Sequence, residues 1–140
     1  MHKRANPSQM MQKVQYNDVV AEVAQYLKER VEYSLAKGIK KDKIILDPGV
    51  GFAKDLHGNC QIIKNSYAFS LNGEFPVLIG ASRKTCIGQL TEKETENRLA
   101  GSLALHILAA QHGASWLRVH DVGEMVDCIK MLKGIECDSV

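Results

Sequence analysis

The sequence has few cysteines, and none are paired in the way that metal sites and redox motifs require. It contains four cysteines in 140 residues, Cys60, Cys86, Cys128 and Cys137, with no C-x-x-C pair. We therefore expect free, buried thiols and neither a zinc site nor a redox motif. The sequence also lacks an apolar run of the roughly 18 residues that a membrane helix needs, and its start lacks the apolar core of a signal peptide. These absences favour a cytoplasmic protein with reduced thiols and no membrane partner.

An excess of charge of one sign is missing too. Eighteen basic residues against sixteen acidic ones leave a net charge of +2, which argues against general binding to nucleic acid or to membrane surfaces. Hydrophobic residues make up 45% of the chain and charged residues 24%, which excludes a disordered or collagen-like protein. A chain of 140 residues can form one domain. It is too short for a complete (β/α)₈ barrel, which needs about 250 residues.

The hydrophobic pattern predicts a helix followed by three strand–helix units. Apolar residues recur at steps of three and four over residues 17–37, where Asn17 can cap the helix and Gly38 can end it. Short apolar runs at 43–47, 76–80 and 114–120 predict buried strands. Helices are expected at 59–71, 94–112 and 122–133. This order is typical of an α/β fold with a parallel sheet and right-handed crossovers.

Each predicted strand ends in polar residues. They are Asp47 after the first strand, Ser82, Arg83 and Lys84 after the second, and Arg118 and His120 on the third. Taken singly, Asp47 could be a turn residue and the segment 82–84 a solvated loop. The third group, on the last strand, could be a structural pair. However, the carboxyl ends of parallel strands meet at one rim, and buried charges are costly unless they are paired or bound to a ligand. The combination therefore favours a binding site over separate packing roles.

The expected site combines several cations with one carboxylate. Arginine and lysine donors suit a phosphate or pyrophosphate, and the loops after the last strands of a barrel are a recurrent phosphate site. The isolated carboxylate of Asp47 suits a heterocyclic ring with several N–H donors. Gly49 and Gly51 would let the backbone approach a flat ligand, against which Phe52 could pack.

Three segments carry a resemblance to a known family. Asp47-Pro-Gly-Val-Gly-Phe-Ala-Lys54, Ile79-Gly-Ala-Ser-Arg-Lys84 and Leu117-Arg-Val-His-Asp-Val122 resemble three motifs of dihydropteroate synthase, in the same order and at similar spacing. Met1-His2 followed by Asn6-Pro7 resembles the segment after the fifth strand of that family's barrel. The resemblance implies a partial (β/α)₈ TIM barrel, made of the last three βα units plus a preceding helix. Residues 1–140 would be the C-terminal half, and the N-terminal half would be absent.

The resemblance also implies an activity. Dihydropteroate synthase condenses 6-hydroxymethyl-7,8-dihydropterin diphosphate with 4-aminobenzoate, giving dihydropteroate and pyrophosphate in folate biosynthesis, and sulfonamide inhibitors compete with the aminobenzoate. The family uses Mg²⁺, whose ligand is expected in the missing half, so no metal ligand is expected in this chain. The full-length family forms homodimers through its last helices.

By matched position, the resemblance assigns catalytic roles to Asp47, Lys84 and Arg118. The implied substrate-binding residues are Met1, Asp47, Gly51, Phe52, Gly80, Ser82, Lys84, Arg118, Val119 and His120. Asp47, Lys84 and Met1 would bind the pterin. Phe52 and Ser82 would border the aminobenzoate site, and Arg118 and His120 would hold the diphosphate.

The length of the chain leaves other functions open. Three strands alone would leave open sheet edges and an exposed barrel-facing surface. We therefore expect a fragment of a longer enzyme that is inactive alone, a split protein completed by another chain, or the remnant of a decayed gene. The alternatives are a non-enzymatic remnant or interaction module, and a pterin-dependent methyltransferase domain.

Overall fold

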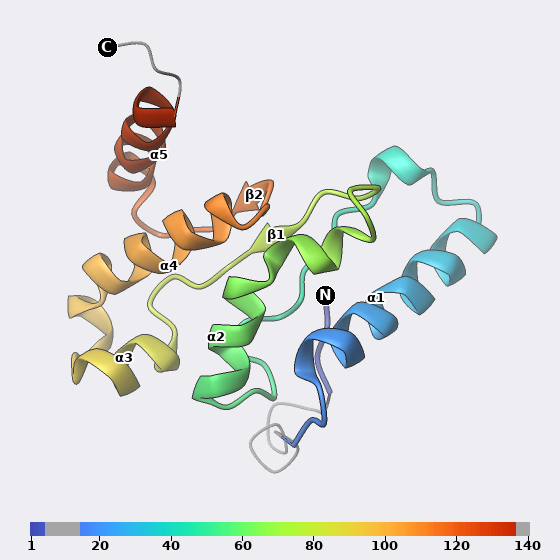
Figure 1. Ribbon diagram of the computed structural model, residues 1–140, viewed down its shortest axis with the longest axis horizontal. Coiled ribbons are helices and arrows are strands. Elements are labelled where there is room, and N and C mark those ends of the chain that lie inside the picture. Colours follow the sequence, from blue (N-terminus) through green and yellow to red (C-terminus); the bar gives the residue numbers. More distant parts are fainter. Residues whose placement is uncertain (5–14, 137–140) are drawn as a thin grey trace.

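Helices alternate with short extended segments along the chain. The structure, a computed structural model, describes residues 1–4 and 15–136. The α-helices are α1 (Val19–Ala36), α2 (Leu56–Lys64), α3 (Thr85–Thr91), α4 (Leu99–Gln111) and α5 (Val122–Glu136). The strands are β1 (Leu78–Ile79) and β2 (Trp116–Leu117), and the 3₁₀ turns are η2 (Lys41–Lys43), η3 (Ser66–Ser70) and η4 (Thr95–Asn97). Helices α1, α2 and α4 follow one another across the molecule, and α5 projects at one end (Figure 1).

The extended segments form a small parallel sheet. β1 pairs with β2 in the register Leu78↔Trp116 and Ile79↔Leu117, and an isolated parallel bridge joins Leu46 to Val77. The three predicted strands therefore lie side by side in chain order, and the predicted α/β class is confirmed. The predicted strand ranges were too long, because only their central residues lie opposite a partner backbone.

Helix α1 begins one residue later than the sequence suggested. The Asp18 side chain accepts hydrogen bonds from the backbone N–H groups of Val20 and Ala21, at 2.9 and 3.0 Å, so Asp18 and not Asn17 is the N-cap. The helix ends before Gly38, whose φ of +84° suits a residue without a side chain.

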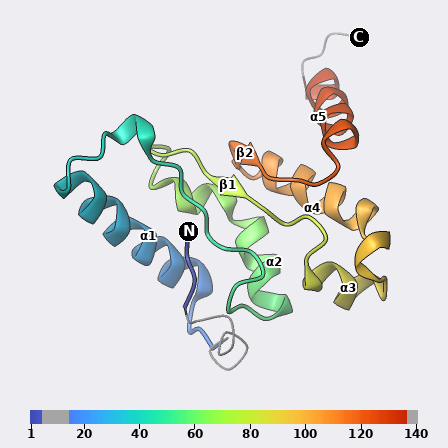
Figure 2. The ribbon, with the colours of Figure 1, turned by 180° about the vertical axis from the view of Figure 1, so that it is seen from behind.

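The hydrophobic core lies between the helices and the sheet. The buried face of α1 packs with residues of α2, η3 and the strands, and the fully buried members of this core include Val23, Ile62, Phe69, Val77 and Ile79. Seen from behind, α1 lies on one side of the extended segments and α4 on the other (Figure 2). The core thus fixes the segments whose carboxyl ends carry the candidate site.

The helices after the first strand differ from the prediction. The helix expected at 59–71 is divided into α2 and η3, and α2 starts early because the Asp55 side chain caps it by accepting from Gly58 N at 2.7 Å. The helix expected at 94–112 is likewise η4 followed by α4. Helix α3 was not predicted at all. It buries Cys86, whereas Cys60 is exposed, so the expectation of buried thiols was wrong for Cys60; Cys137 lies outside the described residues.

Across the described ranges, no helix is both long enough and apolar enough to cross a membrane.

Candidate functional site

The loop at 47–54 follows the first extended segment and is held from the inside by a buried lysine. The Lys54 ammonium donates to the carbonyl oxygens of Gly49 and Phe52, at 3.0 and 3.1 Å. At the other end of the loop, the buried Asp47 carboxylate accepts from Gly49 N at 2.8 Å through Oδ1. Burial lowers the pKa of Lys54 to about 8, and the nearby Asp47 charge opposes that shift.

A side chain of α2 completes the loop. Asn59 is buried and accepts from Gly51 N at 2.7 Å through Oδ1, while its Nδ2 donates to the carbonyl oxygens of Lys54 and Asp55. Gly51 has a φ of +79°, which a residue with a side chain rarely adopts. Sequence reasoning missed both Lys54 and Asn59, although their position beside a glycine-rich loop was the available signal.

The first residues of the chain lie against this loop. His2 N donates to the Asp47 carbonyl oxygen at 2.8 Å, and the His2 ring lies edge-on to Tyr26, with 4.9 Å between centroids. A Cβ on Gly49 would collide with the His2 carbonyl oxygen. Gly49 therefore makes room for the N-terminal segment, and its expected approach to a flat ligand stays a prediction. Met1, at the start of this segment, is 50% exposed.

The contact of this segment is expected to weaken in acid. Burial, followed by the positive charge of Lys54, lowers the pKa of His2 from 6.5 to about 4. Because the docked ring binds a proton more weakly than a free ring, docking loses stability as the pH falls from 6.5 towards 4. NMR titration of the His2 ring should give a midpoint near 4, and the His2 amide should exchange faster as the ring titrates. A midpoint near 6.5 would contradict the docked arrangement, and His2→Gln should remove this pH dependence.

The ends of the second and third strands meet beside the loop. Ser82 Oγ lies 2.8 Å from His120 Nδ1. The Lys84 ammonium lies over the Phe52 ring, 4.4 Å from its centroid. A Cβ on Gly80 would come within 2.7 Å of the Arg118 guanidinium, so this glycine leaves room for the arginine.

The carboxylate and the cations are close to one another. Arg118 Nη2 lies 3.9 Å from Asp47 Oδ2, and the Arg118 side chain is largely exposed. Burial, followed by the positive charge of Arg118, lowers the pKa of Lys84, and the Asp47 charge opposes this shift. A bound anion would offset the repulsion between the cations.

A cavity of about 430 Å³ opens at this rim. Its lining comprises Gly80, Ser82, Arg83, Lys84, Thr95, Arg118, Val119 and His120. Asp47, Gly51 and Phe52 adjoin it through Lys84 and Arg118 rather than lining it. The residues predicted at the three strand ends therefore lie together, and Thr95 of η4 is a lining residue that the sequence did not indicate.

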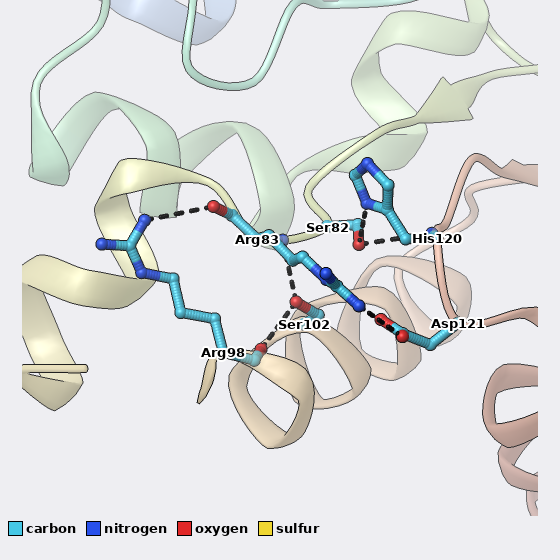
Figure 3. Close-up of polar contacts among 6 residues, drawn as sticks. All are labelled: Ser82, Arg83, Arg98, Ser102, His120 and Asp121. Carbon is cyan, nitrogen blue, oxygen red and sulfur yellow. Dashed lines mark hydrogen bonds and ion pairs between the residues drawn. The ribbon is translucent and has the colours of Figure 1, made fainter. Parts of the chain in front are cut away.

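Arg83 lines the cavity, as expected for a member of the cationic cluster, but it is also paired within the chain. Its Nη2 lies 2.6 Å from Asp121 Oδ1, and both side chains are partly buried (Figure 3). Most of its charge is therefore directed at a carboxylate of the chain itself.

A magnesium ion does not fit the residues that the structure describes. They contain no group of three or more His, Cys, Asp or Glu side chains that could hold a metal ion. The Asp47 carboxylate at the site already accepts from Gly49 N and faces Arg118, so we derive no chemical step through a metal here.

The comparisons with known proteins agree on one family. Residues 1–120 match the profile of the family described as "Pterin binding enzyme". Over 136 residues, the chain is 45% identical to the bifunctional dihydropteroate synthase/dihydropteroate reductase of Helicobacter pylori, covering 97% of this chain and 35% of that protein.

Solved structures give the same result. Dihydropteroate synthase from Stenotrophomonas maltophilia, solved with imidazole bound in its active site, superposes with a TM-score of 0.92 at 36% identity, covering 99% of this chain and 52% of that one. The Xanthomonas albilineans enzyme in complex with 7,8-dihydropteroate gives a TM-score of 0.84 at 44% identity, covering 90% of this chain and 49% of that one. This chain thus spans about half the length of these structures, and it belongs to the pterin binding enzyme family.

Proposed function

We propose that this chain supplies the C-terminal half of a dihydropteroate synthase. In this proposal residues 1–140 form the last three βα units of a (β/α)₈ barrel, with one preceding helix. The observation that carries the proposal is the meeting of a buried carboxylate, a cationic cluster and an aromatic ring at one rim. A pterin diphosphate offers the matching groups, namely ring N–H donors and an anionic leaving group. The complex of the Xanthomonas albilineans relative with 7,8-dihydropteroate supports the choice of ligand.

The exposed apolar surface supports an incomplete barrel. An apolar cavity of about 400 Å³ lies between β2 and α5, and Val122, one of its lining residues, is 60% exposed. At the other end of the sheet, Ile45 is 43% exposed. Large exposed apolar surfaces of this kind mark places where another part of a protein packs. The N-terminal half of the barrel would cover both edges.

The proposed reaction needs no protein nucleophile. The bond between the pterin methylene carbon and the diphosphate oxygen breaks, and the amine nitrogen of 4-aminobenzoate forms the new bond to that carbon and loses a proton. Negative charge builds up on the leaving pyrophosphate, where Arg118 and His120 would stabilise it, and positive charge builds up on the methylene carbon near Asp47.

The remaining residues would bind and orient the substrates. Lys84 and Met1 would contact the pterin. Gly51 and Gly80 would leave room for the side chains of Lys84 and Arg118, respectively. Phe52 and Ser82 would border the aminobenzoate, and sulfonamides would compete there.

Three further features stay proposals. Magnesium would be held by residues outside this chain. A homodimer would form through α5, where Val126 and Met131 are exposed. We also propose a cytoplasmic location, in which the cysteines would stay reduced.

Restoring the missing half tests this function. We would fuse the chain to the N-terminal part of the Stenotrophomonas maltophilia dihydropteroate synthase, of which it covers 52%, and assay dihydropteroate formation in vitro. The fused protein should catalyse the condensation, while the same fusion carrying Asp47→Ala and the 140-residue chain alone should not. A folded fusion without turnover, or turnover by the chain alone, would contradict the proposal.

A further inference from the structure

Helix α4 carries polar residues at every fourth position within an otherwise apolar sequence. Arg98 lies at its N-cap, and Ser102 and His106 follow at successive turns on the same face. Ser102 and His106 are 3% and 0% exposed. Buried polar side chains on a helix are costly unless they are hydrogen-bonded, so their partners indicate what they do. We call Arg98, Ser102 and His106 the polar ridge of α4.

Every member of the polar ridge contacts the backbone of the loop that carries Ser82 and Lys84. His106 Nε2 accepts from Ala81 N at 3.1 Å. Ser102 Oγ accepts from Arg83 N at 2.9 Å, and Arg98 Nη1 donates to the Arg83 carbonyl oxygen at 3.2 Å (Figure 3). The ridge therefore satisfies the polar backbone groups on both sides of Ser82.

Hydrogen bonds within the ridge fix the direction of each of these contacts. Ser102 Oγ donates to the Arg98 carbonyl oxygen at 2.7 Å, which leaves its lone pairs for Arg83 N. His106 Nδ1 lies 2.7 Å from the Ser102 carbonyl oxygen and can only donate to it, so Nε2 is the nitrogen that accepts. Burial lowers the pKa of His106, in agreement with this neutral ring.

The loop needs this support because its backbone is strained. Arg83 has a φ of +57°, a left-handed conformation that is unfavourable for a residue with a side chain. Such residues persist where the surrounding contacts over-determine them. Here the contacts come from the ridge on one side and from Asp121, which pairs with the Arg83 guanidinium, on the other.

We propose that Arg98, Ser102 and His106 are positioning residues that hold Arg83 left-handed, so that Ser82 and Lys84 face the anion cavity. None of the three lines that cavity, so they act through the loop. The turn at Arg83 places Ser82 Oγ against His120 and the Lys84 ammonium over Phe52. This inference rests on the proposed binding of a diphosphate at the cavity, and its test is designed so that the two can fail separately.

The first test compares two buried serines with the same hydrogen-bonding pattern. Ser70 Oγ donates to the Tyr67 carbonyl oxygen and accepts from Gly73 N, both at 2.7 Å, but it lies in η3, away from the cavity. Ser102→Ala and Ser70→Ala should therefore lower the melting temperature similarly. Only Ser102→Ala should weaken the binding of inorganic pyrophosphate to the 140-residue chain, by about tenfold in titration calorimetry. Equal affinity in the two variants would overturn the proposal.

The second test uses a conservative rescue at His106. A glutamine there can still accept from Ala81 N, whereas a leucine of similar volume cannot. His106→Gln should keep the pyrophosphate affinity within about threefold, and His106→Leu should lose about tenfold. Equal affinities in these two variants would overturn the proposal.

Amide hydrogen exchange separates this inference from the proposed function. In Ser102→Ala the Arg83 amide, and in His106→Leu the Ala81 amide, should exchange at least about tenfold faster, whether or not an anion binds. If neither the unmodified chain nor the fused protein bound pyrophosphate, the proposed function of the cavity would be rejected, and faster exchange would still support the positioning role. Unchanged exchange in Ser102→Ala would reject the positioning role alone.

Discussion

Replacing Asp47 by asparagine is expected to weaken pterin binding by thirtyfold or more, a loss of about 2–4 kcal/mol. The physical reason is that the substitution replaces Oδ2, a hydrogen-bond acceptor, by an NH₂ group, which is a donor. Oδ2 is the oxygen that lies 3.9 Å from Arg118 Nη2. A pterin ring would present N–H groups there, and an amide NH₂ group would face them with no acceptor. The other oxygen can still accept from Gly49 N, so the loop should keep its shape.

Calorimetry on the fused protein described above would measure this loss, with the pterin diphosphate and 4-aminobenzoate titrated separately. Asp55→Asn is the matched control, because it removes the same charge at the other end of the loop and keeps the cap on Gly58 N. The control should bind the pterin normally. Equal losses for the pterin and for aminobenzoate in Asp47→Asn would count against the assigned role.

Replacing Arg118 by alanine should weaken the binding of inorganic pyrophosphate by about ten- to hundredfold, the range expected for a hydrogen bond to a charged group of about 1.5–3 kcal/mol. Arg118 lies at the cavity beside Lys84, and Gly80 leaves space for its guanidinium. The side chain is 59% exposed, so its removal should cost little folding stability.

The control for Arg118→Ala is a charge removed far from the cavity. Arg30 lies on α1, where it stacks near Tyr26 and Tyr33. Arg30→Ala changes the net charge equally but should leave the affinity within about twofold, since exposed charges beyond about 10 Å are screened at 0.1 M salt. Calorimetry at that salt concentration would measure both variants. An affinity loss shared by the two would mean that net charge alone attracts the anion.

The residues that meet at the rim could be predicted from sequence because parallel strands deliver their carboxyl ends to one edge. Asp47, Ser82, Lys84, Arg118 and His120 each follow or end a recognisable apolar run. The structure places them together as that rule requires.

The residues that hydrogen-bond the backbone of the loop at the rim could not be predicted in the same way. Ser102 and His106 occur within an apolar helix, and periodicity identifies only its packing face. Their partners are backbone groups 19 and 25 positions away in the chain, which leave no pattern in the sequence. Helix α3 was missed for a related reason. It follows Lys84 with no side-chain cap to mark its start, so tertiary packing of Cys86 and Ile87 stabilises it more than local signals do.

The spacing of the Arg83 contacts has a consequence for how the protein is made. Its backbone partner Ser102 follows 19 residues later, and its charge partner Asp121 follows 38 residues later. While the chain leaves the ribosome, the loop emerges well before either partner, so its left-handed turn has nothing to hold it. The rim should therefore be among the last parts of the chain to become ordered, and a nascent chain stalled before Asp121 should remain open to protease at this loop.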